Sequence, residues 1–295
     1  MHDCLRYGIF FFGLALVSHA CTTTKSPLFS IENITSQEAD GLSGLTSDRS
    51  LALWAVQERR HQILQLTLPE QTAPPKAFQI NDIPEEVDLE SITWLGQNRF
   101  ALGSELDIDN RNSDKVFIVE IHDQIASVTE DFDIAYQHWP MRPSANHGIE
   151  GICYTEPNIL VGIESVIEED NKRYAPIIIY SMITKEALPL KVELTTSTGK
   201  LAAMACRKSD DGNSIDLFII ERHFGVGRIL KFNIAKQKHI SPGTIVHDFA
   251  KDLDDLPNLE GLAIGANNAL YLISDNNFGR ITGPTKLLSL PVNKL

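Results

Sequence analysis

Three glutamates recur at one position of a repeated pattern, and their spacing suggests a metal site. Each copy of the pattern starts with a small or acidic residue, followed by a small and then an apolar residue. It ends in an apolar run that is closed by an acid. The first positions of the five copies are Ser43, Glu90, Glu150, Ala202 and Glu260. Around one axis, like charges about 4 Å apart would repel by roughly 1 kcal/mol per pair in water and about 4 kcal/mol at an effective dielectric of 20. A cation is therefore expected among them.

Three carboxylates and a hydroxyl are the hard oxygen ligands that suit Ca²⁺. Histidine and cysteine are absent from these five positions, which argues against zinc or copper. We therefore predict that Ser43, Glu90, Glu150 and Glu260 bind calcium. The alternative is that each Glu-Gly step is a turn whose carboxylate caps backbone amides or is solvated.

The acid that closes each copy belongs to a second candidate set: Glu58, Glu105, Glu164, Glu221 and Asp275. Arg59 and Arg222 directly follow two of these acids, and guanidinium groups bind phosphate or carboxylate oxygens in pairs. His147 stands three residues before Glu150, close enough to serve as an acid or base. We predict catalytic roles for Glu105, Glu164, Glu221, Arg59, Arg222 and His147. The alternative is a solvated rim with structural ion pairs.

The repeat also predicts the elements that position these residues. Its copies start 47, 60, 52 and 58 residues apart, a spacing typical of β-propeller blades and too long for leucine-rich or ankyrin repeats. Two further strand-like runs follow each of the first four copies, as at Ile63–Leu68 and Ala77–Ile80. We predict an all-β, five-bladed propeller with four strands in each blade; six blades or two domains are the alternatives.

The last copy lacks its outer strand, and the run Leu28–Asn33 can supply it, which would close the ring. In each blade the innermost strand begins on the face where the antiparallel second strand ends. Both acids of a copy should therefore lie on one face, with the first set next to the central axis.

The N-terminus is typical of an exported protein. Arg6 precedes the apolar run Tyr7–Val17, which is too short to span a membrane, and Ser18-His-Ala20 resembles a signal-peptidase site. Cys21 and the polar residues after it resemble a lipoprotein start, so we expect a signal peptide over 1–20, a linker over 21–27 after a lipidated Cys21, and one domain over 28–295. An ordinary secretory signal cut at the same bond is the alternative. The expected location is the periplasm, or the outer membrane through the lipid anchor.

Composition and cysteine usage narrow the function. The 295 residues carry a formal charge of −13, which argues against nucleic-acid binding. The sequence has no G-x-S-x-G, H-E-x-x-H, Walker or dinucleotide motif, so serine-hydrolase and nucleotide-cofactor chemistry are not supported. Cys153 and Cys206 lack metal-ligand spacing, and we expect buried free thiols rather than a disulfide.

Several segments together resemble the phytase-like family, the "esterase-like activity of phytase" proteins. The segments are Gly41–Leu45, Asp88–Ile92, Gly148–Ile152, Ile220–Gly225, Asn258–Ala263 and Leu270–Phe278. The resemblance covers residues 38 to 290 and departs at His147, where arginine is more usual, and at Ala202. The order Ser, Glu, Glu, small, Glu is also similar to the calcium-activated nucleotidases (apyrases), whose calcium lies on such a ring.

The resemblance implies ester or phosphoester hydrolysis. We therefore expect a monomeric hydrolase that binds Ca²⁺ and a small phosphoester or other anionic substrate, and that touches the membrane only through its lipid. The alternative is a non-catalytic, calcium-stabilised binding module of the cell envelope.

Overall fold

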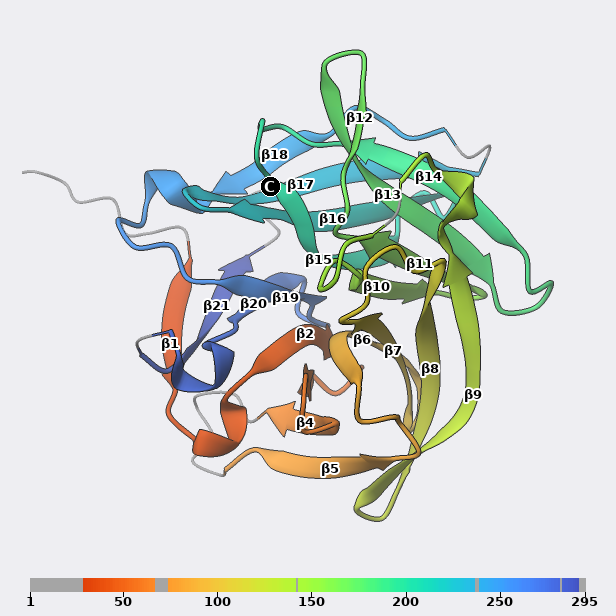
Figure 1. Ribbon diagram of the computed structural model, residues 1–295. Coiled ribbons are helices and arrows are strands. Elements are labelled where there is room, and N and C mark those ends of the chain that lie inside the picture. The colour runs from red at the N-terminus through yellow and green to blue at the C-terminus, as the bar shows by residue number, and fades with distance from the viewer. Residues whose placement is uncertain (1–28, 67–73, 142, 237–238, 282, 292–295) are drawn as a thin grey trace, which may run out of the picture.

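The computed structural model describes residues 29–66, 74–141, 143–236, 239–281 and 283–291 (Figure 1). Within these ranges the regular elements are strands and four 3-10 turns, so the all-β prediction is confirmed. The turns are η1 (Gln37–Ala39), η2 (Tyr136–His138), η3 (Phe249–Lys251) and η4 (Asn277–Gly279). None of the described residues forms a helix long and apolar enough to cross a membrane. The predicted signal peptide and Cys21 lie outside the described residues.

The first half of the chain forms two antiparallel four-stranded units. The first contains β2 (Leu42–Ser47), β3 (Leu53–Gln57), β4 (Gln62–Leu66) and β5 (Lys76–Asn81). The second contains β6 (Val87–Gly96), β7 (Arg99–Leu106), β8 (Ser113–His122) and β9 (Ile125–Ala135). Separate blades were expected, but the outer strands β5 and β9 pair in parallel, so the two units form one sheet of eight strands.

The second half forms three more sheets. One contains β10 (Ile149–Thr155), β11 (Asn158–Ile163), β13 (Lys172–Ser181), β14 (Ala187–Glu193) and the short β12 (Ile167–Glu169). The next contains β15 (Lys200–Lys208), β16 (Ser214–His223), β17 (Val226–Ala235) and β18 (Thr244–Asp248). The last contains β19 (Leu259–Ile264), β20 (Ala269–Ser274), β21 (Thr285–Pro291) and β1 (Ser30–Ile34).

The two ends of the described chain meet in this last sheet. Strand β1 pairs antiparallel with β21, with Ser30 opposite Ser289 and Ile34 opposite Thr285. The pairing predicted from the incomplete last copy of the repeat is therefore confirmed. It covers the edge of β21 and joins the start of the domain to its end.

The sheets surround a common centre, as in a β-propeller (Figure 1). The innermost strands β2, β6, β10, β15 and β19 each contact the next, and β19 contacts β2. Buried apolar residues form clusters between successive four-stranded units, and one cluster joins the last unit to the first. This packing holds the five innermost strands, and the acids that they carry, at fixed positions around the axis.

Cys153 on β10 and Cys206 on β15 form a disulfide, so the expectation of two free thiols was wrong. The cysteines are 53 residues apart in sequence, but their Cα atoms are 5.7 Å apart because β10 and β15 are neighbours at the centre. This separation is within the range that a disulfide spans.

Candidate functional site

A β-bulge occurs in each of the five innermost strands at the start of the repeat. In β6, β10, β15 and β19 the residue left out of the strand register is Glu90, Glu150, Ala202 and Glu260, in that order. In β2 the residue left out is Gly44, next to Ser43, and its φ of 59° favours glycine. Bulges change the direction of a side chain. Here they free the predicted ring residues from the alternation of their strands.

The three ring glutamates are buried, and the charge of Glu260 acts on both Glu90 and Glu150. Glu90, Glu150 and Glu260 are 8, 7 and 8% exposed. Burial raises the pKa of Glu90 well above its usual range, and the charges of Glu58 and Glu105 add to the effect. Burial likewise raises the pKa of Glu150, with Glu90 as the largest repelling charge and Glu260 among the others. Glu150 is therefore within electrostatic reach of both Glu90 and Glu260.

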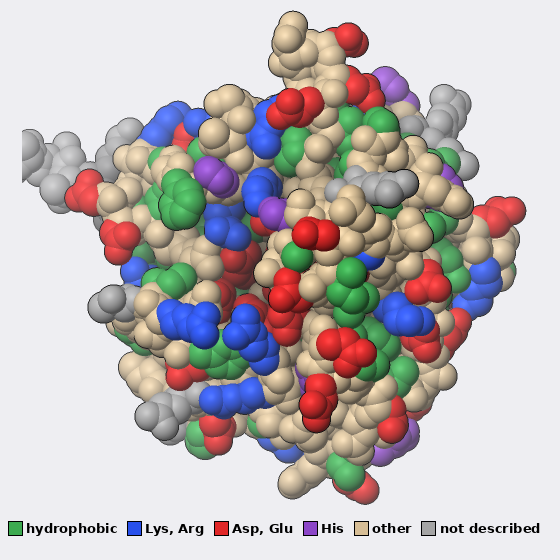
Figure 2. All heavy atoms as spheres, in the orientation of Figure 1, with side chains coloured by type: hydrophobic (Ala, Val, Ile, Leu, Met, Phe, Trp, Pro, Cys, Tyr) green, Lys and Arg blue, Asp and Glu red, His purple; other side chains and the backbone are tan. Residues whose placement is uncertain are grey.

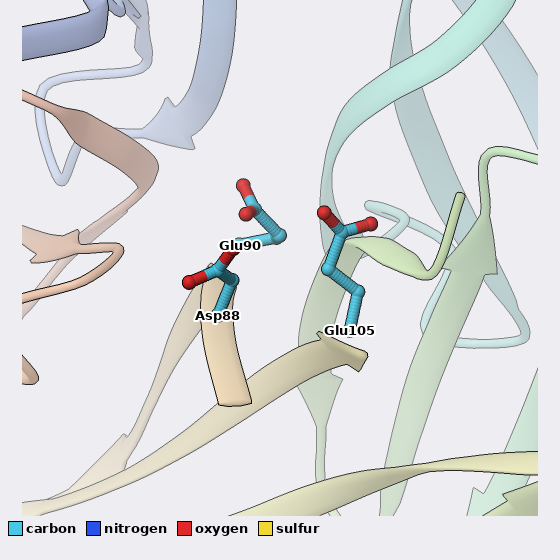
Figure 3. A group of neighbouring side chains, drawn as sticks. All are labelled: Asp88, Glu90 and Glu105. Atoms are coloured by element: carbon cyan, nitrogen blue, oxygen red, sulfur yellow. The ribbon is translucent and has the colours of Figure 1, made fainter. Parts of the chain in front are cut away.

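The tightest group of acids differs from the predicted ligand set. Ligand atoms of Asp88, Glu90 and Glu105 all lie within 4.8 Å of one another, the one such group of three in the described part of the chain (Figure 3). Asp88 and Glu90 are on β6, and Asp88 pairs with Glu105 across β6 and β7. We call these three residues the acid cluster. Of the predicted calcium ligands, Glu90 alone belongs to it.

Two of the other predicted ligands, Ser43 and Glu260, have polar partners of their own. Ser43 Oγ donates a hydrogen bond of 2.8 Å to Glu90 Oε2. Glu260 Oε1 is 2.6 Å from Arg222 Nη2, whereas its buried Oε2 has no hydrogen-bond partner among the described residues. Burial raises the pKa of Glu260 to about 8, although Arg222 opposes this shift. Glu260 is thus only partly neutralised by Arg222.

Glu105 was predicted as a catalytic residue; the pairing of β7 with β6 brings it into the acid cluster, and it also contacts the segment before β10. Its Oε2 accepts a hydrogen bond of 3.0 Å from the backbone N–H of Gly148. A Cβ at position 148 would overlap the Cβ of Glu105, so glycine is required there. Burial raises the pKa of Glu105 to about 7, opposed by the Gly148 hydrogen bond and increased by the charge of Glu164.

Glu164, His147 and a lysine that the repeat analysis missed form a second polar group. Glu164 Oε2 is 3.3 Å from His147 Nε2, and Glu164 Oε1 is 3.4 Å from Lys200 Nζ. Lys200 Nζ is also 2.8 Å from His147 Nε2. His147 therefore stands beside one of the predicted rim acids, Glu164.

Glu221 lies near the end of β16, and its carboxylate is held by a loop rather than standing among the other acids. Its carboxylate is fully buried and accepts hydrogen bonds from the backbone N–H and the hydroxyl groups of Thr195 and Thr196. Glu221 was predicted to belong to the rim, but the loop before β15 folds over the end of β16 and covers its carboxylate. The contacts of this carboxylate indicate a structural role.

The remaining rim residues lie next to Glu260. Burial raises the pKa of Glu58 to about 8, and the charges of Asp275 and Glu260 contribute to the shift. Burial also raises the pKa of Asp275, although its carboxylate accepts a hydrogen bond from the Asn277 N–H. Arg59 is exposed, its charge lowers the pKa of both Glu58 and Asp275, and its guanidinium lies 6.0 Å from the centre of the Phe278 ring.

Asp88 and Lys200 occupy equivalent positions of the repeat, and the sequence alone shows this equivalence. Each lies two residues before a ring position, at the place filled elsewhere by Gly41, Gly148 and Asn258. In each copy this position lies at the start of the innermost strand or directly before it. Reading this position together with the ring would have found both residues.

The assembled site is a hollow rich in acids at the centre of one face (Figure 2). Below it, Leu45, Ile92, Ile152, Met204 and Leu262 pack around the axis and leave no room for a water molecule beside Glu150, although four of them also line a separate pocket of about 130 Å³. A ligand can therefore reach the acids from this one face. The raised pKa values have a simple consequence: either several carboxylates hold protons near neutral pH, or a cation neutralises them. The oxygen-only donor set of the acid cluster fits a hard divalent cation.

The family model described as "Phytase-like: Esterase-like activity of phytase" matches residues 37–278. No curated protein matches the chain. Among solved structures, a PQQ-bound aldose sugar dehydrogenase from Streptomyces coelicolor is similar, with 9% identity, coverage of 88% of this chain and 97% of that one, and a TM-score of 0.49. The Nup133 β-propeller domain of Vanderwaltozyma polyspora has 8% identity, coverage of 86% and 84%, and a TM-score of 0.41.

Proposed function

The chain belongs to the phytase-like family, and from this premise we propose that it is an exported hydrolase that binds Ca²⁺ at the acid cluster and cleaves a phosphoester. The observation that carries the proposal is the packing of Asp88, Glu90 and Glu105 within 4.8 Å, in a hollow where burial raises the pKa values of Glu90 and Glu105. Such a concentration of carboxylates is costly unless a cation accompanies it.

Asp88, Glu90 and Glu105 would hold the ion, with Ser43, Glu150 and Glu260 close by. The unpaired, buried Oε2 of Glu260 supports an additional positive group on this side of the hollow. A bound divalent ion supplies charge neutralisation and polarisation of a phosphoryl oxygen. Calcium is favoured over magnesium because it accepts more oxygen ligands in less regular geometries.

Glu164 and His147 are the residues proposed to handle protons. Of the three rim carboxylates nominated from the sequence, Glu221 is bound by threonines and Glu105 belongs to the acid cluster, which leaves Glu164. Its carboxylate would orient a water molecule for attack on phosphorus and accept the proton, and His147, 3.3 Å away, would transfer a proton to the leaving oxygen. The ammonium group of Lys200, 3.4 Å from Glu164 Oε1, places a positive charge beside Glu164 and His147.

Arg59 and Arg222 are proposed to face the anionic substrate. Arg59 is exposed at the rim, where an anion can approach its guanidinium. Arg222 is anchored by Glu260 at 2.6 Å and by Asn258 Oδ1 at 2.6 Å, which fixes its guanidinium beside the hollow. Guanidinium groups fixed in advance can balance charge that develops on phosphoryl oxygens.

We also propose that the propeller has five blades, with the parallel β5–β9 pairing as a contact between two of them. The ring of contacts among β2, β6, β10, β15 and β19 supports this count. The proposed location is the periplasm or the outer membrane, with a lipid on Cys21 as the one membrane contact and a monomer as the working state. The Cys153–Cys206 disulfide supports export, because such bonds persist in oxidising compartments.

Release of inorganic phosphate tests the proposal. The full mature chain would be incubated with a panel of phosphoesters and nucleotides, in calcium and in chelator, and compared with Glu90→Gln and with the exposed control Glu38→Gln. We expect calcium-dependent release that falls by at least about tenfold in Glu90→Gln and is unchanged in the control. Equal rates with and without chelator would exclude the metal-dependent reaction.

A second candidate is a calcium-stabilised binding module without catalysis. The observation that favours it is that two nominated catalytic groups are already engaged, Glu221 by Thr195 and Thr196 and Arg222 by Glu260. Calcium that raises the melting temperature while no substrate of the panel releases phosphate would support this module instead.

A further inference from the structure

A pocket of about 470 Å³ lies beside the hollow, and the proposed hydrolysis gives it no role. Its walls come from the tip of the β16–β17 hairpin, the loop that precedes β19 and the residues that follow β20. Its volume is in the range of pockets that bind small organic molecules. We call it the side pocket.

The side pocket has an apolar wall from separate segments. The wall contains Phe224, Leu256, Pro257, Ile281 and Pro284. Phe224 at the hairpin tip is 95% exposed, and its ring meets the His223 ring edge to face with centroids 5.2 Å apart. A single exposed phenylalanine needs no explanation, but one that stands over a concave apolar surface offers a face to a ligand.

The side pocket and the acid-rich hollow share a boundary. Arg222 and Asn258 line the pocket, and Arg222 also contacts Glu260 at 2.6 Å. Asp275 lines the pocket too, and its charge is among those that raise the pKa of Glu58. A substrate whose charged group lies in the hollow can therefore extend past Arg222 into the side pocket.

We propose that the side pocket binds a planar apolar group, the aryl substituent of an anionic ester whose charged head occupies the hollow. This inference rests on the proposed function, because it uses the hollow as the seat of the charged head. The aromatic ring of Phe224 and the compact apolar rings of Pro257 and Pro284 suit a planar apolar guest better than a polar one. A sugar phosphate or inositol phosphate would leave this wall uncovered.

Binding of two phosphonates tests the inference without requiring turnover. Phenylphosphonate and methylphosphonate share the charged head, differ in the apolar group and are not hydrolysed as esters. Calorimetric titration would use the calcium-loaded mature chain, the variant Phe224→Ala, and Ile183→Ala as a control, because Ile183 is 76% exposed outside the side pocket. A second variant, Leu256→Ala, alters the wall from a different segment.

We expect the wild type to bind phenylphosphonate at least about tenfold more tightly than methylphosphonate. Phe224→Ala and Leu256→Ala should each reduce this preference to about threefold or less, with unchanged affinity for methylphosphonate, while Ile183→Ala keeps it. Equal affinities in the wild type, no binding of either compound, or an unchanged preference in Phe224→Ala would overturn the inference. A preference for phenylphosphonate without phosphate release from any substrate would contradict the proposed function alone. Phosphate release from non-aryl esters only would contradict the inference alone.

Discussion

Substitution of Glu105 by glutamine should change stability in opposite directions with and without calcium. Burial raises the pKa of Glu105 from 4.5 to about 7, so the folded protein without metal retains a proton that the unfolded chain loses. Because the folded-state pKa of Glu105 is raised, its protonated carboxyl contributes fully to folding stability below about pH 4.5. This contribution is lost as the pH rises through about 7. At pH 8 in chelator, the ionised carboxylate therefore opposes folding.

The size of the effect follows from the shift of about 2.5 pKa units between those two values. At 1.36 kcal/mol per unit, the cost at pH 8 is about 3 kcal/mol. Glu105→Gln removes this charge, and the amide oxygen can still accept the hydrogen bond from Gly148. In chelator the variant should unfold about 6–12 °C higher than the wild type, at 2–4 °C per kcal/mol for a domain of this size.

Saturating calcium should reverse the order. The wild type gains about 4.1 kcal/mol when the ion is present at a thousand times its dissociation constant, which exceeds the cost of about 3 kcal/mol, whereas the variant lacks one carboxylate ligand and gains much less. Thermal unfolding followed by circular dichroism near pH 5, 6, 7 and 8 measures both effects, with Glu38→Gln as the exposed control. A variant that is less stable than the wild type in chelator at pH 8, or a difference that does not change between pH 5 and pH 8, would refute the reasoning.

Three further changes should affect stability through contacts already described. Arg222→Met leaves Glu260 without its ion-pair partner and should lower the free energy of unfolding in chemical denaturation by roughly 3 kcal/mol. Adding Glu260→Gln should recover part of this loss. If the effects of the two substitutions simply add, the pairing is contradicted. Replacing both Cys153 and Cys206 by serine opens a crosslink between residues 53 apart and should lower stability by about 4 kcal/mol, or roughly 10 °C in melting temperature; reduced and oxidised wild type that melt together would argue against the crosslink. Glu221→Gln should lower the melting temperature by several degrees, because its carboxylate holds the loop before β15, and phosphate release measured well below that temperature should stay within about twofold of the wild type; a large loss of turnover with no thermal effect would return Glu221 to the catalytic residues.

The sequence determined the strands and the ring positions. The repeat gave the start of β6, β10 and β19 and so placed Glu90, Glu150 and Glu260 next to one axis, and the incomplete last copy predicted the β1–β21 pairing. These features depend on the alternation and spacing of residues within one copy. They can therefore be predicted from the sequence without knowledge of how the repeat copies pack against one another.

Only the tertiary structure decided which charges face one another. Asp88 and Glu105 come together through the register of β6 and β7, Lys200 reaches Glu164 from the neighbouring sheet, and the loop before β15 removes Glu221 from the rim. The Cys153–Cys206 bond likewise depends on the contact of two innermost strands. Register, bulges and loop paths result from packing between units, and a spacing pattern within one unit does not encode them.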